Sequence, residues 1–176
     1  MSDKTMPYFV DCEFIEDGHT IDLLSIGVAC GDGRELYLEN GQADWSKANL
    51  WVQENVLPHL TGVGKPRWRI GHDLRAFVGD DIPEFWSWCG AYDWVAICQL
   101  YGAMVDKPAG WPNYCRDLQQ EMDRLGVTDD QLPAHPGDAH NALADARWHR
   151  HIWLYLAAMQ RESTTPSVGC GGRDLP

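Results

Sequence analysis

The sequence of 176 residues predicts a single α/β domain, built on a mixed five-stranded sheet that carries helices on both faces. Three β-type segments open the chain and are joined by hairpin turn signals, which indicates an antiparallel meander. Strand-type and helix-type segments then alternate, which is typical of parallel strands joined by helices. We place the domain at residues 1–162 and expect residues 163–176, rich in Gly, Ser, Thr and Pro, to form a disordered tail.

The predicted meander has the clearest pattern. We expect its strands at Tyr8 to Ile15, Thr20 to Cys30 and Arg34 to Glu39, because these runs favour β structure. The dipeptides Asp17-Gly18 and Asp32-Gly33 between them signal tight turns. Strands joined by such short turns pair in antiparallel fashion.

Helices follow the meander. The first is expected at Trp45 to Val56, where Ala48 and Val52 share one helical face. Pro58 marks its end, because proline cannot continue a helix. After a connection that contains Gly and Pro, we expect a shorter helix at Ile70 to Val78.

The next part of the chain alternates strands with helices. A strand at Glu84 to Cys89 precedes a helix at Tyr92 to Tyr101, and Gly90 separates the two. A brief strand at Asn113 to Asp117 then leads into a helix that Gly126 ends.

The longest helix is expected last, from about Ala139 to Gln160. Its apolar stripe consists of Trp148, Ile152, Tyr155 and Met159. Small residues near its start would let the helix approach the sheet closely: Ala142, Ala144 and Ala146.

Composition and charge narrow the classes of function. The formal net charge of −12 argues against a protein that grips long nucleic acid by phosphate neutralisation alone. No apolar run approaches the roughly 18 residues that span a membrane, and no signal peptide is evident, so we expect a cytoplasmic protein. The six cysteines form no C-x-x-C pair, which favours reduced core residues over disulfides or a zinc site.

Asp11 and Glu13 lie one residue apart in the first predicted strand. Because side chains alternate along a strand, both carboxylates point to one side, opposite to Val10, Cys12 and Phe14. Neighbouring buried carboxylates repel each other and are costly to desolvate unless a cation lies between them. Oxygen ligands of this kind suit Mg²⁺ or Mn²⁺. The alternative is an edge strand on which both carboxylates face water.

Three further polar residues lie near helix starts. Asp93 opens the helix after the fourth strand, where open α/β sheets bind ligands, although a helix dipole alone also favours an acidic residue there. Asp145 lies among small and apolar residues, where a buried carboxylate needs a partner such as a metal ion. His140 precedes Asp145 by five residues, and its alternative interpretation is an ordinary loop histidine.

D-x-E on the first strand, Asp93, and H-x-A-x-x-D at the last helix together resemble the DEDDh family of 3'-to-5' exonucleases, which have a ribonuclease H-like fold. The resemblance covers about residues 8 to 160. The strings DCEFIEDGHTIDLLSIGV and GAYDWVAICQLYG are more narrowly similar to the small mycobacterial-type exoribonucleases. Many relatives have an Asn shortly before the second-motif Asp, where this chain has Gly90-Ala91-Tyr92, so a role of that Asn is not supported here.

The resemblance implies two-metal-ion hydrolysis of RNA from its 3' end, with release of nucleoside 5'-monophosphates. Asp11 would bridge two Mg²⁺ or Mn²⁺ ions, and Glu13 and Asp145 would complete the more tightly held one. Asp93 would help directly or through water. His140 would be the general base, since the ordinary pKa of histidine lies near operating pH. The residues implied in substrate contacts are Cys12, Glu13, Phe14, Tyr92 and His140.

Two other functions stay open at this stage. A DNA exonuclease of the proofreading type would differ in its contacts to the 2'-hydroxyl, which spacing cannot show. A binding module of the same fold would hold a nucleotide without cutting it, and the complete set of four carboxylates with His140 argues against that. A homodimer and a monomer are both open. Similar exonucleases form pairs, and some of the nine tryptophans would cover apolar surface in a dimer, whereas in a monomer they would lie in an aromatic core.

Overall fold

The computed structural model describes residues 5–137 and 139–164. Its centre is a five-stranded sheet in the order β3-β2-β1-β4-β5. The strands are β1 Met6–Glu16, β2 Ile21–Cys30, β3 Glu35–Glu39, β4 Pro83–Ser87 and β5 Arg116–Asp117. The first three pair in antiparallel fashion, whereas β4 runs parallel to β1 and β5 runs parallel to β4. The predicted meander and mixed sheet are therefore confirmed.

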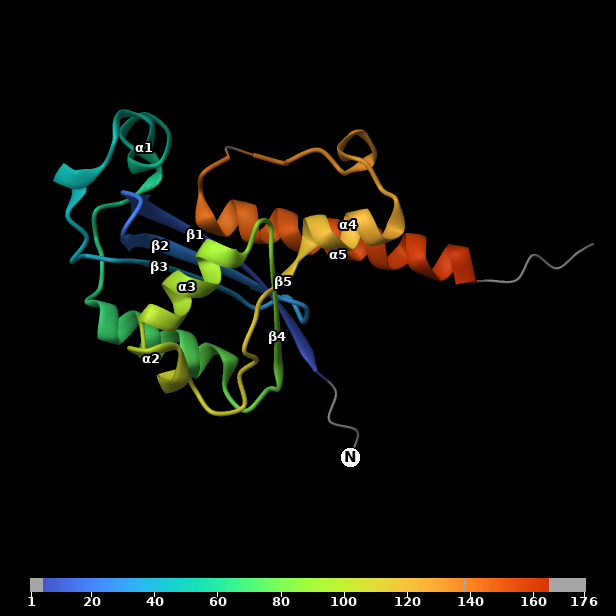
Figure 1. Ribbon diagram of the computed structural model, residues 1–176, viewed down its shortest axis with the longest axis horizontal. Coiled ribbons are helices and arrows are strands. Elements are labelled where there is room, and N and C mark those ends of the chain that lie inside the picture. Colours follow the sequence, from blue (N-terminus) through green and yellow to red (C-terminus); the bar gives the residue numbers. More distant parts are fainter. Residues whose placement is uncertain (1–4, 138, 165–176) are drawn as a thin grey trace, which may run out of the picture.

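Helices cover both faces of the sheet (Figure 1). One face packs against α2, Arg67–Val78, and α3, Ala91–Gln99, and the other packs against α4, Leu118–Leu125, and α5, Ala142–Thr164. Alternate β1 side chains enter the two cores. Tyr8, Val10 and Cys12 face α2 and α3, and Phe9 faces α4 and α5. The odd-numbered positions of β1 from Phe9 to Glu13 therefore face α5, whereas Ile15, after a shift in register, packs in a third cluster beside α1.

The helix expected at Trp45 to Val56 is broken in the structure. A 3-10 turn at Trp45–Lys47 precedes α1, Leu50–Asn55, and a second 3-10 turn at Leu57–His59 follows. The break has a local cause: the Asn49 side chain accepts a bond from a backbone N–H of α1 and so starts a new helix. The expected apolar face is still buried.

Other boundaries differ by a few residues. Helix α2 begins at Arg67, directly after Pro66, and β5 begins only at Arg116 but ends as predicted at Asp117, which caps α4. Helix α5 begins at Ala142, since the Asn141 side chain accepts the Ala144 N–H. It also includes the first two residues of the predicted tail, and the rest of that tail, residues 165–176, lies outside the described residues.

The start of α5 lies directly on β2. A Cβ atom added at Gly27 would lie 2.1 Å from the Ala142 carbonyl oxygen, so only glycine allows this approach. Ala142 and Ala146 are fully buried beneath the helix. The predicted close contact between this helix and the sheet is confirmed, and it brings Asp145 over β1.

Within the described residues, no helix combines the length and the apolar character that crossing a membrane requires. The cysteines in these residues carry free thiols, as expected: Cys12, Cys30, Cys89, Cys98 and Cys115. Cys89 is exposed rather than part of the core.

Candidate active site

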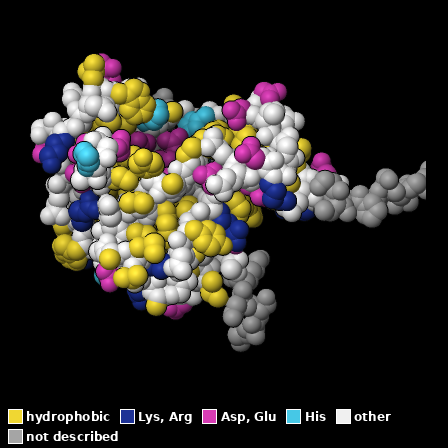
Figure 2. Space-filling view, viewed as in Figure 1, with side chains coloured by type: hydrophobic (Ala, Val, Ile, Leu, Met, Phe, Trp, Pro, Cys, Tyr) yellow, Lys and Arg dark blue, Asp and Glu magenta, His cyan; other side chains and the backbone are white. Residues whose placement is uncertain are grey.

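Acidic side chains gather in a hollow of the surface beside α1, with histidine side chains next to them (Figure 2). The cleft at this place has a volume of about 210 Å³. Nine residues line it: Asp11, Cys12, Glu13, Trp88, Ala139, His140, Asp145, Trp148 and His149. The structure thus brings residues of β1, of α5 and of the segment before α5 into one site.

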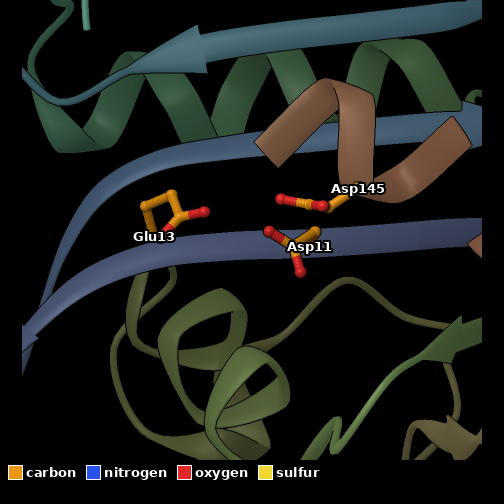
Figure 3. A group of neighbouring side chains, drawn as sticks. All are labelled: Asp11, Glu13 and Asp145. Carbon is orange, nitrogen blue, oxygen red and sulfur yellow. The ribbon is translucent and has the colours of Figure 1, made fainter. Parts of the chain in front are cut away.

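Asp11, Glu13 and Asp145 face one another in this cleft (Figure 3). One carboxylate oxygen from each lies within 4.8 Å of the other two. Asp11 and Glu13 share the face of β1 that looks toward α5, and Asp145 lies in the first turn of α5. The expectation that the two β1 carboxylates share one face is correct.

This triad, Asp11, Glu13 and Asp145, is largely buried and rich in negative charge. Only 9% of Glu13 is exposed, and burial with the charges of Asp145 and Asp93 raises the pKa of Glu13 to about 7. Burial and the same kind of repulsion hold the pKa of Asp11 well above its ordinary value. Such a cluster is costly when ionised unless a cation shares the space. A set of oxygen ligands alone fits hard divalent ions such as Mg²⁺ or Mn²⁺.

Asp93 lies beside the triad but is held by protein groups. Its Oδ1 accepts the Cys12 backbone N–H at 2.7 Å, and its Oδ2 accepts the Ser87 hydroxyl at 3.0 Å. The parallel pairing of β1 with β4 ends at Phe9 and Trp86, so the Cys12 N–H beyond it turns to Asp93. Burial raises the pKa of Asp93 to about 6, although these hydrogen bonds act to lower it. The charge of Asp93 also raises the pKa of Asp11.

His140 lies at the mouth of the cleft in an unusual backbone conformation. Its φ is 69°, in the left-handed region that few residues other than glycine adopt. The backbone N–H of His140 donates to Asp145 Oδ2 at 2.9 Å, which ties the residue to the triad. The His140 ring meets the Trp51 ring of α1 edge-on, with the ring centres 4.8 Å apart. The structure therefore places His140 beside the carboxylates, as the resemblance to the exonucleases implies.

The predicted substrate contacts differ in their access to the cleft. Phe14 and Tyr92 stack with ring centres 5.9 Å apart, and 51% of Tyr92 is exposed. Phe14 is partly buried against the core that contains Cys12, so Tyr92 is the ring of this pair that is exposed and can stack on an unpaired base. The Cys12 side chain instead packs in the core on the opposite face of β1. Its thiol is therefore directed away from the cleft, and only its main chain can face a substrate there.

Residues 6–157 match the family described as the 3'-5' exoribonuclease Rv2179c-like domain. The chain belongs to this family. The resemblance to small mycobacterial-type exoribonucleases is thereby confirmed. The chain is 46% identical over 149 residues to the 3'-5' exoribonuclease Rv2179c of Mycobacterium tuberculosis strain H37Rv, covering 81% of this chain and 88% of that protein. The identity and coverage are the same for 3'-5' exoribonuclease MT2234.1 of M. tuberculosis strain CDC 1551.

The fold of this Rv2179c-like chain is also similar to that of exonuclease I. One exonuclease I structure matches with a TM-score of 0.65 and 12% identity, over 91% of this chain and 42% of that one. A product-bound exonuclease I structure matches with a TM-score of 0.64 and 13% identity, over 90% of this chain and 45% of that one. At this low identity the match shows the fold alone, and it confirms the predicted ribonuclease H-like fold.

Two histidines of the site were not predicted. His149 is almost fully buried, its Nδ1 donates to the Val10 carbonyl oxygen at 3.0 Å, and its Nε2 lies 4.0 Å from Asp11 Oδ1. Its position four residues after Asp145 puts both on one helical face, which is a signal that the sequence did contain. His135 reaches Asp145 from a loop ten residues earlier. No spacing rule predicts that contact, because the path of the loop sets it.

Proposed function

We propose that this protein is a metal-dependent 3'-5' exoribonuclease that releases nucleoside 5'-monophosphates from RNA. The observation that carries the proposal is the triad of Asp11, Glu13 and Asp145, whose oxygens lie within 4.8 Å of one another in a chain of the Rv2179c-like family. The family is described by its 3'-5' exoribonuclease activity, which is hydrolysis of a phosphodiester. The buried cluster of carboxylates supports the same chemistry, because it can hold the divalent ions that such a hydrolysis uses.

The triad would hold two Mg²⁺ or Mn²⁺ ions, with Asp11 between them. Two such ions, when bound, stabilise the attacking and the leaving oxygens of an in-line displacement. Asp93 supports this arrangement through protein contacts, because its bond to the Cys12 N–H fixes the β1 backbone between the two acidic residues of that strand. We retain Asp93 as a metal-site residue that contributes through its charge or a bridging water.

His140 would act as the general base that takes a proton from the attacking water. Its backbone bond to Asp145 and the edge contact with Trp51 both restrict where its ring lies relative to the carboxylates. A general base needs this kind of fixed position, because proton transfer requires hydrogen-bond reach to the water in the bound complex.

The terminal nucleotide would lie between the triad and the stacked aromatic pair. Phe14 follows Glu13 directly in β1, and Tyr92 precedes Asp93 directly in α3, so both rings adjoin acidic residues of the site. Stacking on an aromatic ring tolerates any base, which suits an enzyme that removes nucleotides one after another. The main chain of Cys12 and the side chains of Glu13 and His140 complete the proposed contacts.

The test uses matched RNA and DNA oligonucleotides labelled at the 5' end, incubated with and without Mg²⁺ or Mn²⁺. We expect RNA to shorten from its 3' end only with metal, with nucleoside 5'-monophosphates as products, and a blocked 3'-hydroxyl to protect it. Undiminished cleavage in excess EDTA, or products with 3'-phosphates, would refute the two-metal mechanism. Faster cleavage of DNA would favour the proofreading-type alternative, and nucleotide binding without cleavage would favour a binding module.

A further inference from the structure

We propose that His135 is a positioning residue for Asp145: it fixes the carboxylate in the orientation in which it ligates metal. The inference rests on the proposed function, because it assigns a task to a residue beside the same metal site. His135 lies in the segment between α4 and α5, ten residues before Asp145. It would act through Asp145 and not on the substrate.

The contact between His135 and Asp145 is short and specific. His135 Nε2 lies 2.7 Å from Asp145 Oδ1, and both side chains are partly buried. The other ring nitrogen, Nδ1, lies 2.9 Å from the Gly137 carbonyl oxygen. Both nitrogens of the ring are therefore engaged, which sets the plane and the direction of the imidazole.

The loop that carries His135 is itself fastened to α5. Trp148 Nε1 donates to the Pro133 carbonyl oxygen at 3.0 Å, and the rings of Trp148 and His135 meet edge-on with centres 5.1 Å apart. Trp148 follows Asp145 by three residues, so it projects from the same side of the helix. The histidine and the carboxylate that it contacts are thus held by one helix.

The result is a carboxylate whose two oxygens are both fixed. Asp145 Oδ1 faces His135, and Oδ2 accepts the backbone N–H of His140 at 2.9 Å. Each carboxylate oxygen has a second lone pair, so ligation of a cation beside Asp11 and Glu13 is still available (Figure 3). Partners that orient a metal ligand in this way are worth about 10- to 100-fold in metal affinity.

An opposite role for His135 would give an opposite result. If its ring only occupied the place of a cation at Asp145, removing it would free the carboxylate and raise metal affinity. The sign of the change therefore separates positioning from competition.

The experiment is a calorimetric titration of Mn²⁺ into the metal-free protein. We compare the parent protein with three variants. His135→Ala removes the ring, and His135→Gln keeps a hydrogen-bond donor for Asp145. His151→Ala is the control, because it removes an exposed histidine of α5. His135→Ala should lower the affinity by about 10- to 100-fold. His135→Gln should recover most of that loss, and His151→Ala should bind as the parent does.

A second measurement separates positioning from general damage to the fold. The Mn²⁺ concentration that half-activates RNA hydrolysis should rise in His135→Ala, while the rate at saturating Mn²⁺ recovers most of the parent value. If His135→Ala does not fold, Trp148→Phe takes its place, because it removes the bond to Pro133 and should shift affinity in the same direction by less.

Unchanged or higher Mn²⁺ affinity in His135→Ala, with normal binding by the parent, would overturn the positioning role and leave the proposed function intact. A parent that binds no Mn²⁺ and leaves RNA intact would instead refute the proposed function itself, and this inference with it.

Discussion

At the scale of single residues, Glu13 couples the stability of the metal-free protein to pH. Its pKa is raised from 4.5 to about 7, so between these values the folded state keeps a proton that the unfolded state has released. The free energy of unfolding therefore falls as pH rises through this window. Asp11 and Asp93, with raised pKa values, act in the same direction. Buried His149, whose pKa is lowered to about 4, acts in the opposite direction.

Glu13→Gln should therefore stabilise the metal-free protein at pH 8 and change little at pH 4. The gain at pH 8 is at most about 3 kcal/mol, from the size of the pKa shift at about 1.4 kcal/mol per unit. Urea unfolding in EDTA at the two pH values measures it. Saturating Mn²⁺ should reverse the order, because the variant lacks a ligand. A variant no more stable than the parent at pH 8 would mean that the Glu13 charge does not destabilise the fold.

His140 and Asp145 should differ in what they contribute. His140→Ala is expected to lower the rate by about 10²- to 10⁴-fold, the usual size of a general-base contribution, with metal binding retained. Asp145→Ala should lose both activity and metal affinity, because it removes a ligand and leaves Asp11 and Glu13 with less cation to offset their repulsion. Initial rates on one RNA at saturating Mn²⁺ measure the first effect. Near-normal turnover by His140→Ala would show that His140 is not the general base.

At the level of secondary structure, the close packing of α5 against β2 at Gly27 sets the position of Asp145. Gly27→Ala should lower the melting temperature, because its Cβ would lie 2.1 Å from the Ala142 carbonyl oxygen and the helix must move. Overpacking of this kind costs about 1 to 3 kcal/mol or more. Gly137→Ala is the matched control, since a Cβ there meets nothing within 4 Å. Calorimetry compares the two, and equal melting temperatures would contradict the account of this contact.

Most elements could be predicted because their signals are local. Hairpin turns mark the meander, and Gly126, with a φ of 68°, ends α4 as its position in the sequence predicts. The break before α1 was missed because Asn49 competes with an otherwise continuous helical pattern. The shared face of Asp11 and Glu13 could be predicted from their spacing in one strand, whereas the approach of Asp145 to them was implied by the resemblance to the exonuclease family. The contact of His135 could not be predicted, because it depends on the path of a long loop.

At the scale of the whole molecule, association stays a prediction. Large hydrophobic side chains are exposed on α1 and α2, among them Leu50, Trp51 and Trp68. A homodimer would cover part of such a surface. Light scattering at micromolar concentration distinguishes the two states: a monomer has a mass of 19.9 kDa and a dimer has twice that. A measured mass of about 20 kDa would refute the homodimer.

We propose that the fold is organised around a site for two divalent ions. Two carboxylates of the triad come from β1 and one comes from α5, which packs on that face of the sheet. A metal ion bound there would therefore also hold these two elements together. Ligands that bind only the folded state stabilise it by an amount that grows with the logarithm of the ratio of ligand concentration to Kd. Metal binding should therefore be visible without any substrate.

The decisive test of this site is a titration of Mn²⁺ into the metal-free protein with a nucleoside 5'-monophosphate present, in parallel with the same titration of Asp11→Asn. We expect two ions per chain for the parent and a loss of both in Asp11→Asn, because Asp11 would be a ligand of each. Absence of saturable binding by the parent, or Asp11→Asn binding as tightly as the parent, would contradict the proposed two-ion site.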